Sequence, residues 1–123
     1  MGWVIDGRCL YWTIRFYHER YGLPILVTEN GMADNDTVTD GKIADHKRIG
    51  FMKEYLANVK RAVAEGIPVL GYQYWSLMDN FEWAEGYGPR FGLIHVDYET
   101  KKRTPKDSAY EYKRIIEMGG EAL

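Results

Sequence analysis

The chain has 123 residues, a typical length for one domain, and we expect residues 1–123 to form a single folded unit. It is 46% hydrophobic and 15% aromatic, which argues against disorder, and its net charge of -2 comes without a basic stripe, which argues against nucleic-acid binding. No apolar stretch is long enough to span a bilayer, and no signal peptide is visible. The single cysteine, Cys9, allows no intrachain disulfide, so we expect a cytoplasmic location. The three histidines are scattered, and we expect neither a metal site nor a cofactor.

The first predicted helix covers residues 8–21. Asp6 precedes it as the expected N-cap, and Gly22 follows it at the place where a left-handed residue commonly ends a helix. The apolar positions repeat with helical spacing and predict one buried stripe. This stripe contains Leu10, Ile14, Tyr17 and Tyr21.

A strand, a loop and a second helix are predicted next. Residues 25–28 form a short apolar and β-branched run, which is typical of a buried parallel strand. Residues 30–41 are polar and rich in turn-forming residues, which predicts a loop of the kind that carries functional groups. The clearest helical period covers residues 43–65, and Gly66 and Pro68 end it. Its apolar stripe contains Ile49, Met52, Leu56, Val59 and Val63.

A second strand is predicted over residues 69–75, where Gly71 permits another group to approach closely. An aromatic, glycine-containing segment follows, and residues 93–98 form a short extended piece. A last helix over residues 108–118 has an apolar side made of Ala109, Tyr112, Ile115 and Ile116. The order helix, strand, helix, strand, helix predicts an α/β fold that is part of a (β/α)8 TIM barrel, with about two strands and three helices.

A carboxylate follows the first strand, in the sequence TENG at residues 28–31. The C-terminal ends of barrel strands carry the chemistry of such folds, and Glu29 could act there as a nucleophile, a general acid or base, or a metal ligand. Asn30 can donate a hydrogen bond, and Gly31 lets the chain turn sharply. Taken alone, these residues also fit a glutamate that caps a turn or faces solvent.

A second cluster, WSLMDNFEW, follows the second strand at residues 75–83. Here Glu82 lies near Trp75 and Trp83 in the sequence. A carboxylate can accept hydrogen bonds from two sugar hydroxyls, and indole rings can cover the apolar face of a sugar. The cluster therefore favours a sugar-binding site. The alternative is an aromatic plug over the barrel core, with Glu82 paired to Arg90.

These runs resemble the signatures of the family 1 glycoside hydrolases. ILVTENGMA at 25–33 is similar to the nucleophile signature of that family, and residues 75–83 are similar to its second signature. YGPRFGL at 87–93 and RTPKDS at 103–108 are similar to its C-terminal pattern. The resemblance covers nearly the whole chain. It implies two C-terminal strands of the barrel of a retaining β-glycosidase that hydrolyses terminal β-D-glucosides.

The resemblance also implies a role for each residue of the second cluster. Glu82 would bind sugar hydroxyls far from the reacting carbon, and Trp83 would donate its indole N–H to one of them. Trp75 would stack under the sugar ring, and Phe91 would close one side of the pocket. The peptide between Trp75 and Ser76 is expected to be cis. Because Glu82 would repel a phosphate, the resemblance points to unphosphorylated β-glucosides, galactosides or fucosides.

The catalytic groups implied by the resemblance are incomplete. Glu29 would be the nucleophile, and Asn30 would contact the substrate beside it, but retaining enzymes need a second carboxyl group about 5–5.5 Å away. The Asn-Glu-Pro segment that carries this acid/base in the family does not occur in the sequence. We therefore expect weak activity, unless a neighbouring subunit supplies a carboxylate such as Asp34, Asp79 or Glu85.

Two parallel strands leave both edges unpaired, so we expect a homo-oligomer or pairing with a complementary N-terminal barrel part. Three interpretations of function follow. The first is a truncated glycosidase with residual or assembly-dependent activity. The second is a carbohydrate-binding remnant without turnover, and the third is a barrel fragment with no function of its own.

Overall fold

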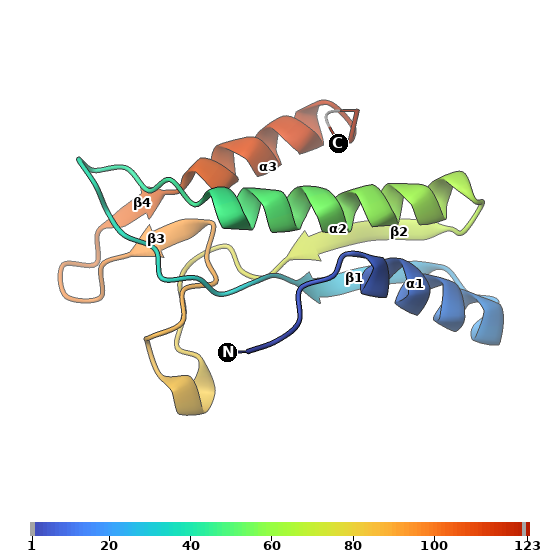
Figure 1. Cartoon of the computed structure of the whole chain (residues 1–123), viewed down its shortest axis with the longest axis horizontal. Coiled ribbons are helices and arrows are strands. Elements are labelled where there is room, and N and C mark those ends of the chain that lie inside the picture. Colours follow the sequence, from blue (N-terminus) through green and yellow to red (C-terminus); the bar gives the residue numbers. More distant parts are fainter. Residues whose placement is uncertain (1, 122) are drawn as a thin grey trace.

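The computed structural model describes residues 2–121 and 123, in which three helices pack with a short parallel sheet (Figure 1). The predicted order of helices and strands is confirmed, and the structure adds a 3-10 helix and a β-hairpin. No helix in the described part of the chain combines the length and the apolar character needed to cross a membrane. The elements are α1 (Arg8–Tyr21), β1 (Ile25–Asn30), α2 (His46–Ala64), β2 (Val69–Tyr74), η1 (Trp83–Glu85), β3 (Ile94–Val96), β4 (Arg103–Pro105) and α3 (Asp107–Glu117).

Strands β1 and β2 form a two-stranded parallel sheet whose register runs from Ile25 opposite Val69 to the ends of both strands. The helices cover one side of the sheet, where Val27 is buried against α1 and α2. The prediction of a fully buried strand is wrong for the other side, because no described element covers it. There, Leu26 is 48% exposed and Leu70 is 72% exposed.

The two ends of α1 differ in how well they were predicted. Gly22 has a left-handed φ of 65°, and its N–H donates to the His18 carbonyl at 2.8 Å, as expected of a helix end. The predicted N-cap is wrong by one residue, since Gly7 holds that position. The Asp6 carboxylate instead accepts a hydrogen bond from the Arg8 N–H at 3.0 Å, which still satisfies one amide of the first turn.

The buried face of α1 is shorter than predicted. Ile14 is buried as expected, but Tyr17 and Tyr21 are 47% and 59% exposed and stack on each other instead. No described element covers this end of the helix. The core around α1 contains Tyr11, Ile14, Val27, Val59, Ala62 and Ile67.

Helix α2 is buried on a wider face than a single stripe, because it packs against α1 on one side and α3 on the other (Figure 1). The predicted Met52, Leu56 and Val59 are buried, whereas Val63 is 50% exposed. Gly66 follows the helix with a φ of 88°, which agrees with its predicted role as a stop. Further buried side chains of this helix are Arg48, Phe51, Tyr55 and Ala62.

The C-terminal part forms a hairpin and then α3. Strand β3 confirms the predicted extended piece, but β4, which pairs antiparallel with it, was not predicted. Its three residues are separated from α3 only by Lys106 and have no apolar run to mark them. On α3, Ile115 is buried, whereas Ile116 is 62% exposed and lines a shallow apolar groove with Leu77 and Leu93.

Candidate active site

Glu29 lies at the C-terminal end of β1, as predicted. The pairing of the two strands ends with Asn30 opposite Tyr74, so Glu29 is the second-last residue of β1 before the chain leaves the sheet. The Glu29 side chain is exposed. A carboxylate at this edge of a parallel sheet is placed where barrel folds carry their chemistry.

Gly31 allows the segments that follow the two strands to come together. A Cβ atom placed on it would lie 1.7 Å from the Trp75 carbonyl oxygen, a distance that no side chain can tolerate. The sequence predicted a sharp turn at this residue. The structure shows that its function is the close approach of two backbones, which brings the residues after β2 next to Glu29.

Asn30 anchors the end of β1 to β2. Its amide oxygen accepts a hydrogen bond from the Tyr72 hydroxyl at 2.8 Å, and its backbone carbonyl accepts one from the Trp75 N–H at 3.0 Å. Burial raises the pKa of Tyr72, so this phenol stays a neutral donor. The amide nitrogen of Asn30 makes no hydrogen bond with the described residues and is the group available to a ligand.

The aromatic residues after β2 are partly open to solvent. Trp75 is 38% exposed, and the Trp75–Ser76 peptide is cis, as the resemblance implied. Trp83 begins η1 with a left-handed φ of 44° and is 83% exposed. A bulky residue in that region of backbone space is unusual and is more often found at functional sites than in ordinary packing.

Glu82 is half-buried and is not paired with Arg90. The Glu82 carboxylate accepts a hydrogen bond from the Asn80 side chain at 3.2 Å. The Arg90 guanidinium instead donates to Asp79 at 2.9 Å. The alternative of an aromatic plug closed by an ion pair between Glu82 and Arg90 therefore lacks its ion pair.

A single open cleft of about 920 Å³ connects these groups. Both predicted carboxylates, Glu29 and Glu82, line it, and they are the only carboxylates among the described residues that do so. The remaining predicted site residues line the same cleft, among them the deeply buried Phe91. They are Asn30, Trp75, Trp83 and Phe91.

The segment before α1 also lines this cleft and was missed as part of the site. Figure 1 shows the N-terminal segment running towards the part of the chain that contains η1. Trp3 is 68% exposed and Val4 is 88% exposed, and both lie on the wall of the cleft with Ile5 and Cys9. Trp3 lies outside every predicted element, so no local pattern in the sequence indicated its place on the cleft.

A buried network of charges holds the loops of the site in place. Arg48 has no exposed surface and donates to Asp45 at 2.8 Å and to Asp36 at 2.5 Å. It also donates to the Met32 carbonyl at 2.8 Å and to the Arg90 carbonyl at 3.1 Å. Arg48 therefore connects the segment after β1 with the segment after β2.

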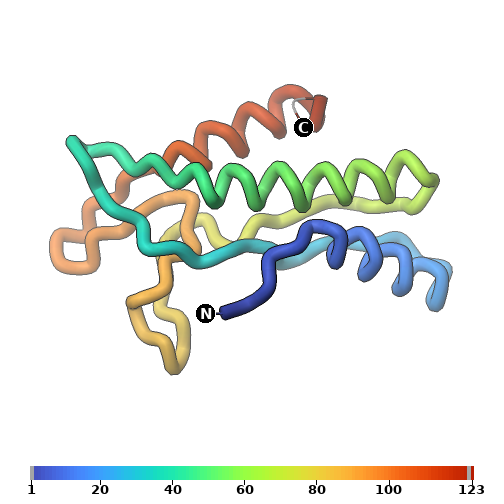
Figure 2. The backbone as a smooth tube through the Cα atoms, viewed as in Figure 1, coloured from blue at the N-terminus to red at the C-terminus, as the bar shows by residue number. Residues whose placement is uncertain are grey.

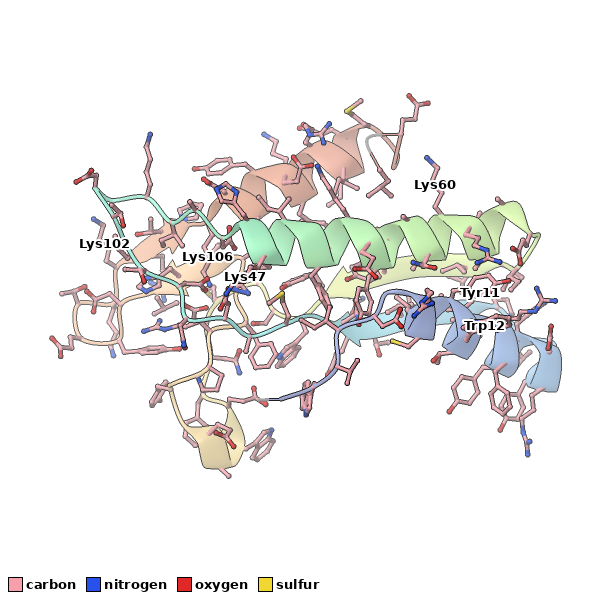
Figure 3. All side chains as sticks on the ribbon, in the orientation of Figure 1. Tyr11, Trp12, Lys47, Lys60, Lys102 and Lys106 are labelled. Carbon is pink, nitrogen blue, oxygen red and sulfur yellow. The ribbon has the colours of Figure 1, made fainter. Side chains whose placement is uncertain are left out.

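Lys106 is the second buried cation of this network (Figure 3). Its ammonium group donates to Asp36 and, at 2.9 Å, to Asp79. Figure 2 shows how the long segment between β1 and α2 reaches the β3–β4 hairpin before it returns, and Lys106 joins the two. Although burial acts to raise the pKa of Asp79, the hydrogen bond and charge of Lys106 outweigh it, and the pKa is lowered.

Asp79 is therefore wrong as a candidate replacement acid/base. Its side chain has no exposed surface and is held ionised by Lys106 and Arg90. Asp34 is bonded at 3.5 Å to Lys47, and its backbone pairs with Arg90. Neither Asp34 nor Glu85 lines the cleft. Within residues 2–121 and 123, no cluster of His, Cys, Asp and Glu side chains could hold a metal ion.

Comparison with known proteins gives consistent matches over almost the whole chain. The profile of glycosyl hydrolase family 1 matches residues 1–121. Beta-glucosidase A of Thermotoga maritima is 45% identical over 98% of this chain and 27% of its own length. The bifunctional beta-D-glucosidase/beta-D-fucosidase of Bifidobacterium breve is 51% identical over 94% of this chain and 26% of its own.

The structural similarity is equally close. The beta-glucosidase of Thermotoga maritima in complex with glucoimidazole superposes with a TM-score of 0.96 at 44% identity, over 98% of this chain and 28% of that one. The same enzyme in complex with isofagomine lactam also gives a TM-score of 0.96. The chain thus spans slightly more than a quarter of the length of these relatives, and its fold is that of part of their structure.

Proposed function

Since this chain belongs to glycosyl hydrolase family 1, we propose that it carries the nucleophile and part of the sugar-binding surface of a retaining β-glucosidase. Its strands β1 and β2 would be two C-terminal strands of the eight-stranded barrel. The observation that carries the proposal is that Glu29 and Glu82, which come from the ends of two neighbouring strands, line one cleft.

In the proposed reaction the Glu29 carboxylate attacks the anomeric carbon of a β-glucoside. The bond from this carbon to the leaving oxygen breaks, and a covalent glycosyl-enzyme forms that water then hydrolyses. Glu29 suits this role because it is exposed in the cleft and makes no ion pair with the described residues. A carboxylate without an ion-pair partner has its oxygens free to attack.

Glu82 and the two tryptophans would hold the sugar. The Glu82 carboxylate uses one of its acceptor positions for Asn80 and keeps others for sugar hydroxyls. Trp75 and Trp83 offer exposed indole surface in the same cleft for the apolar face of the ring. A negative carboxylate at this place disfavours sugars that carry a phosphate, and the names of the relatives point to glucosides and fucosides.

This chain does not supply the acid that would donate a proton to the leaving group. The only described carboxylates in the cleft are Glu29 and Glu82, and Glu82 is assigned to sugar binding. Loss of general acid catalysis costs about 10²–10⁴-fold in rate. Aryl leaving groups of low basicity depart without a proton, so they are the substrates that the chain alone should cleave.

The uncovered side of the sheet indicates how the chain associates. Each strand of the β1–β2 sheet has one edge without a partner among the described residues, and Leu26 and Leu70 are exposed on the uncovered face of the same sheet. Such edges bind other strands. We expect the isolated chain to self-associate, unless a complementary N-terminal barrel part covers these edges. Light scattering tests this, and a stable monomer of 14.3 kDa that melts cooperatively would contradict it.

Two assays together test the proposed function. The first measures release of dinitrophenolate from dinitrophenyl β-glucoside by the parent and by Glu29→Ala. The second follows tryptophan fluorescence during titration with glucoimidazole. Equal rates for the two proteins would refute the nucleophile, a fluorescence response without turnover would support a carbohydrate-binding remnant, and no response in either assay would leave only a barrel fragment.

A further inference from the structure

Asn80 connects the cis peptide segment after β2 with the Glu82 carboxylate. The amide oxygen of Asn80 lies 3.1 Å from the Ser76 hydroxyl, and its amide nitrogen donates to Oε2 of Glu82 at 3.2 Å. The same nitrogen donates to the Phe81 carbonyl at 3.1 Å, and the backbone carbonyl of Asn80 accepts a hydrogen bond from Tyr98 at 3.2 Å. Every polar group of this side chain is therefore engaged.

The chemistry of the neighbours fixes which way the Asn80 amide faces. The Glu82 carboxylate and the Phe81 carbonyl can only accept, so both require the NH2 end. The Ser76 hydroxyl is the group on the other side that can donate to the amide oxygen. Its single hydrogen is shared with the Met78 carbonyl, which accepts it at 2.7 Å, so the orientation of the amide follows from the two acceptors at its NH2 end.

The Glu82 carboxylate has no other hydrogen-bond donor among the described residues. Its backbone is held by the turn of η1, where the Glu82 N–H donates to the Gly86 carbonyl at 2.7 Å. This fixes the position of the Cα atom and leaves the side-chain torsions free. Asn80 is therefore the group that selects one orientation of the carboxylate in a cleft that is otherwise open.

We propose that Asn80 is a positioning residue, which pre-orients the Glu82 carboxylate for the hydroxyls of the sugar. This inference rests on the proposed function of the cleft and deepens it. A glutamate held by one hydrogen bond before the ligand arrives loses less rotamer freedom on binding than a free one. Its second oxygen stays open to the ligand.

The decisive variant is Asn80→Asp, which keeps the shape and the acceptor that faces Ser76 but replaces the NH2 group that donates to Glu82 and to the Phe81 carbonyl with an oxygen. Two oxygens without a hydrogen between them repel, so the Glu82 carboxylate must move. We expect glucoimidazole to bind at least about tenfold more weakly, which corresponds to about 1.4 kcal/mol. Asn58→Asp is the matched control, because Asn58 lies on α2 and bonds only to the Glu54 carbonyl of its own helix.

Repeating Asn80→Asp in a Glu82→Gln background separates positioning from general damage. The amide at position 82 can donate to the new carboxylate, so the hydrogen bond forms again with reversed polarity. We expect Asn80→Asp to cause a clearly smaller loss of affinity in that background, where only the lost hydrogen bond to the Phe81 carbonyl remains. An equal loss in both backgrounds, or no loss in either, would overturn the proposal, because a purely structural defect does not depend on the group at position 82.

A crystal structure of Asn80→Ala tests the positioning without any ligand. The Glu82 carboxylate should leave its place, while the backbone of residues 75–83 stays as in the parent. If the carboxylate keeps its orientation, the proposal is wrong. If it moves but the parent does not bind glucoimidazole, the positioning holds and the sugar-binding function fails.

Discussion

Replacing the buried Lys106 by Met should destabilise the chain far more than replacing an exposed lysine. The ammonium group is fully buried and bonds to Asp36 and Asp79, so its removal leaves a buried cluster with one excess negative charge. At an effective dielectric constant of about 20, the pair at 2.9 Å to Asp79 attracts by about 6 kcal/mol before desolvation is subtracted. Removal of one partner of a buried pair typically costs about 3–5 kcal/mol, and we expect a loss in that range.

The measurement is the free energy of unfolding from urea denaturation at pH 7, with Lys102→Met as the control. Lys102 is exposed on the turn of the β3–β4 hairpin, and its replacement should change the free energy by less than about 0.5 kcal/mol (Figure 3). Because the destabilised network holds excess carboxylate, Lys106→Met should also recover part of its stability when the pH is lowered from 7 to 5. A loss below about 1 kcal/mol, or a pH response like that of Lys102→Met, would refute the argument.

Three further predictions concern the backbone, acid stability and turnover. Gly31→Ala should disrupt the site and lower the free energy of unfolding by about 3 kcal/mol or more, because its Cβ atom would overlap the Trp75 carbonyl. The control Gly50→Ala, in open space on α2, should raise the free energy of unfolding by about 0.5–1 kcal/mol. Similar effects at both glycines in urea denaturation would contradict this. The pKa of Asp79 is lowered on folding, so its contribution is present above its unfolded pKa and is lost as the pH falls through the lower folded value. Circular dichroism should therefore show unfolding below about pH 4 and constant structure from pH 5 to 8, and constant structure down to pH 2 would count against it. Dinitrophenyl β-glucoside should be cleaved at least about 10²-fold better than cellobiose, because only cellobiose needs the missing acid; comparable rates would show that a proton donor is present.

The sequence was sufficient to predict the parts of the fold that depend on local patterns. The helical periods located α1, α2 and α3, and the short β-branched run located β1. Because parallel strands end at the same edge of a sheet, the placement of Glu29 and Glu82 in one cleft followed from their positions after β1 and β2. Errors arose at faces such as Tyr17 and Ile116, where amphipathic spacing is present but no described element covers the side chain.

The charge network could not be predicted from the sequence. Lys106 is 70 residues from Asp36 and 27 from Asp79, and in the sequence it is one charged residue at the start of a helix. Only the folded chain shows that these groups meet without solvent. The same holds for Trp3, whose place on the cleft depends on the path of an irregular segment, and for Gly31, whose close neighbour is 44 residues away.

Covalent trapping of the nucleophile is the most direct test of the proposed enzyme. The chain would be incubated with dinitrophenyl 2-fluoro-β-glucoside, and the intact mass and peptide masses would be measured for the parent and for Glu29→Gln. Our account predicts that one fluoroglucosyl group is attached to Glu29 and none to the variant. Unlabelled parent protein that still binds glucoimidazole, or a label on any other residue, would contradict it.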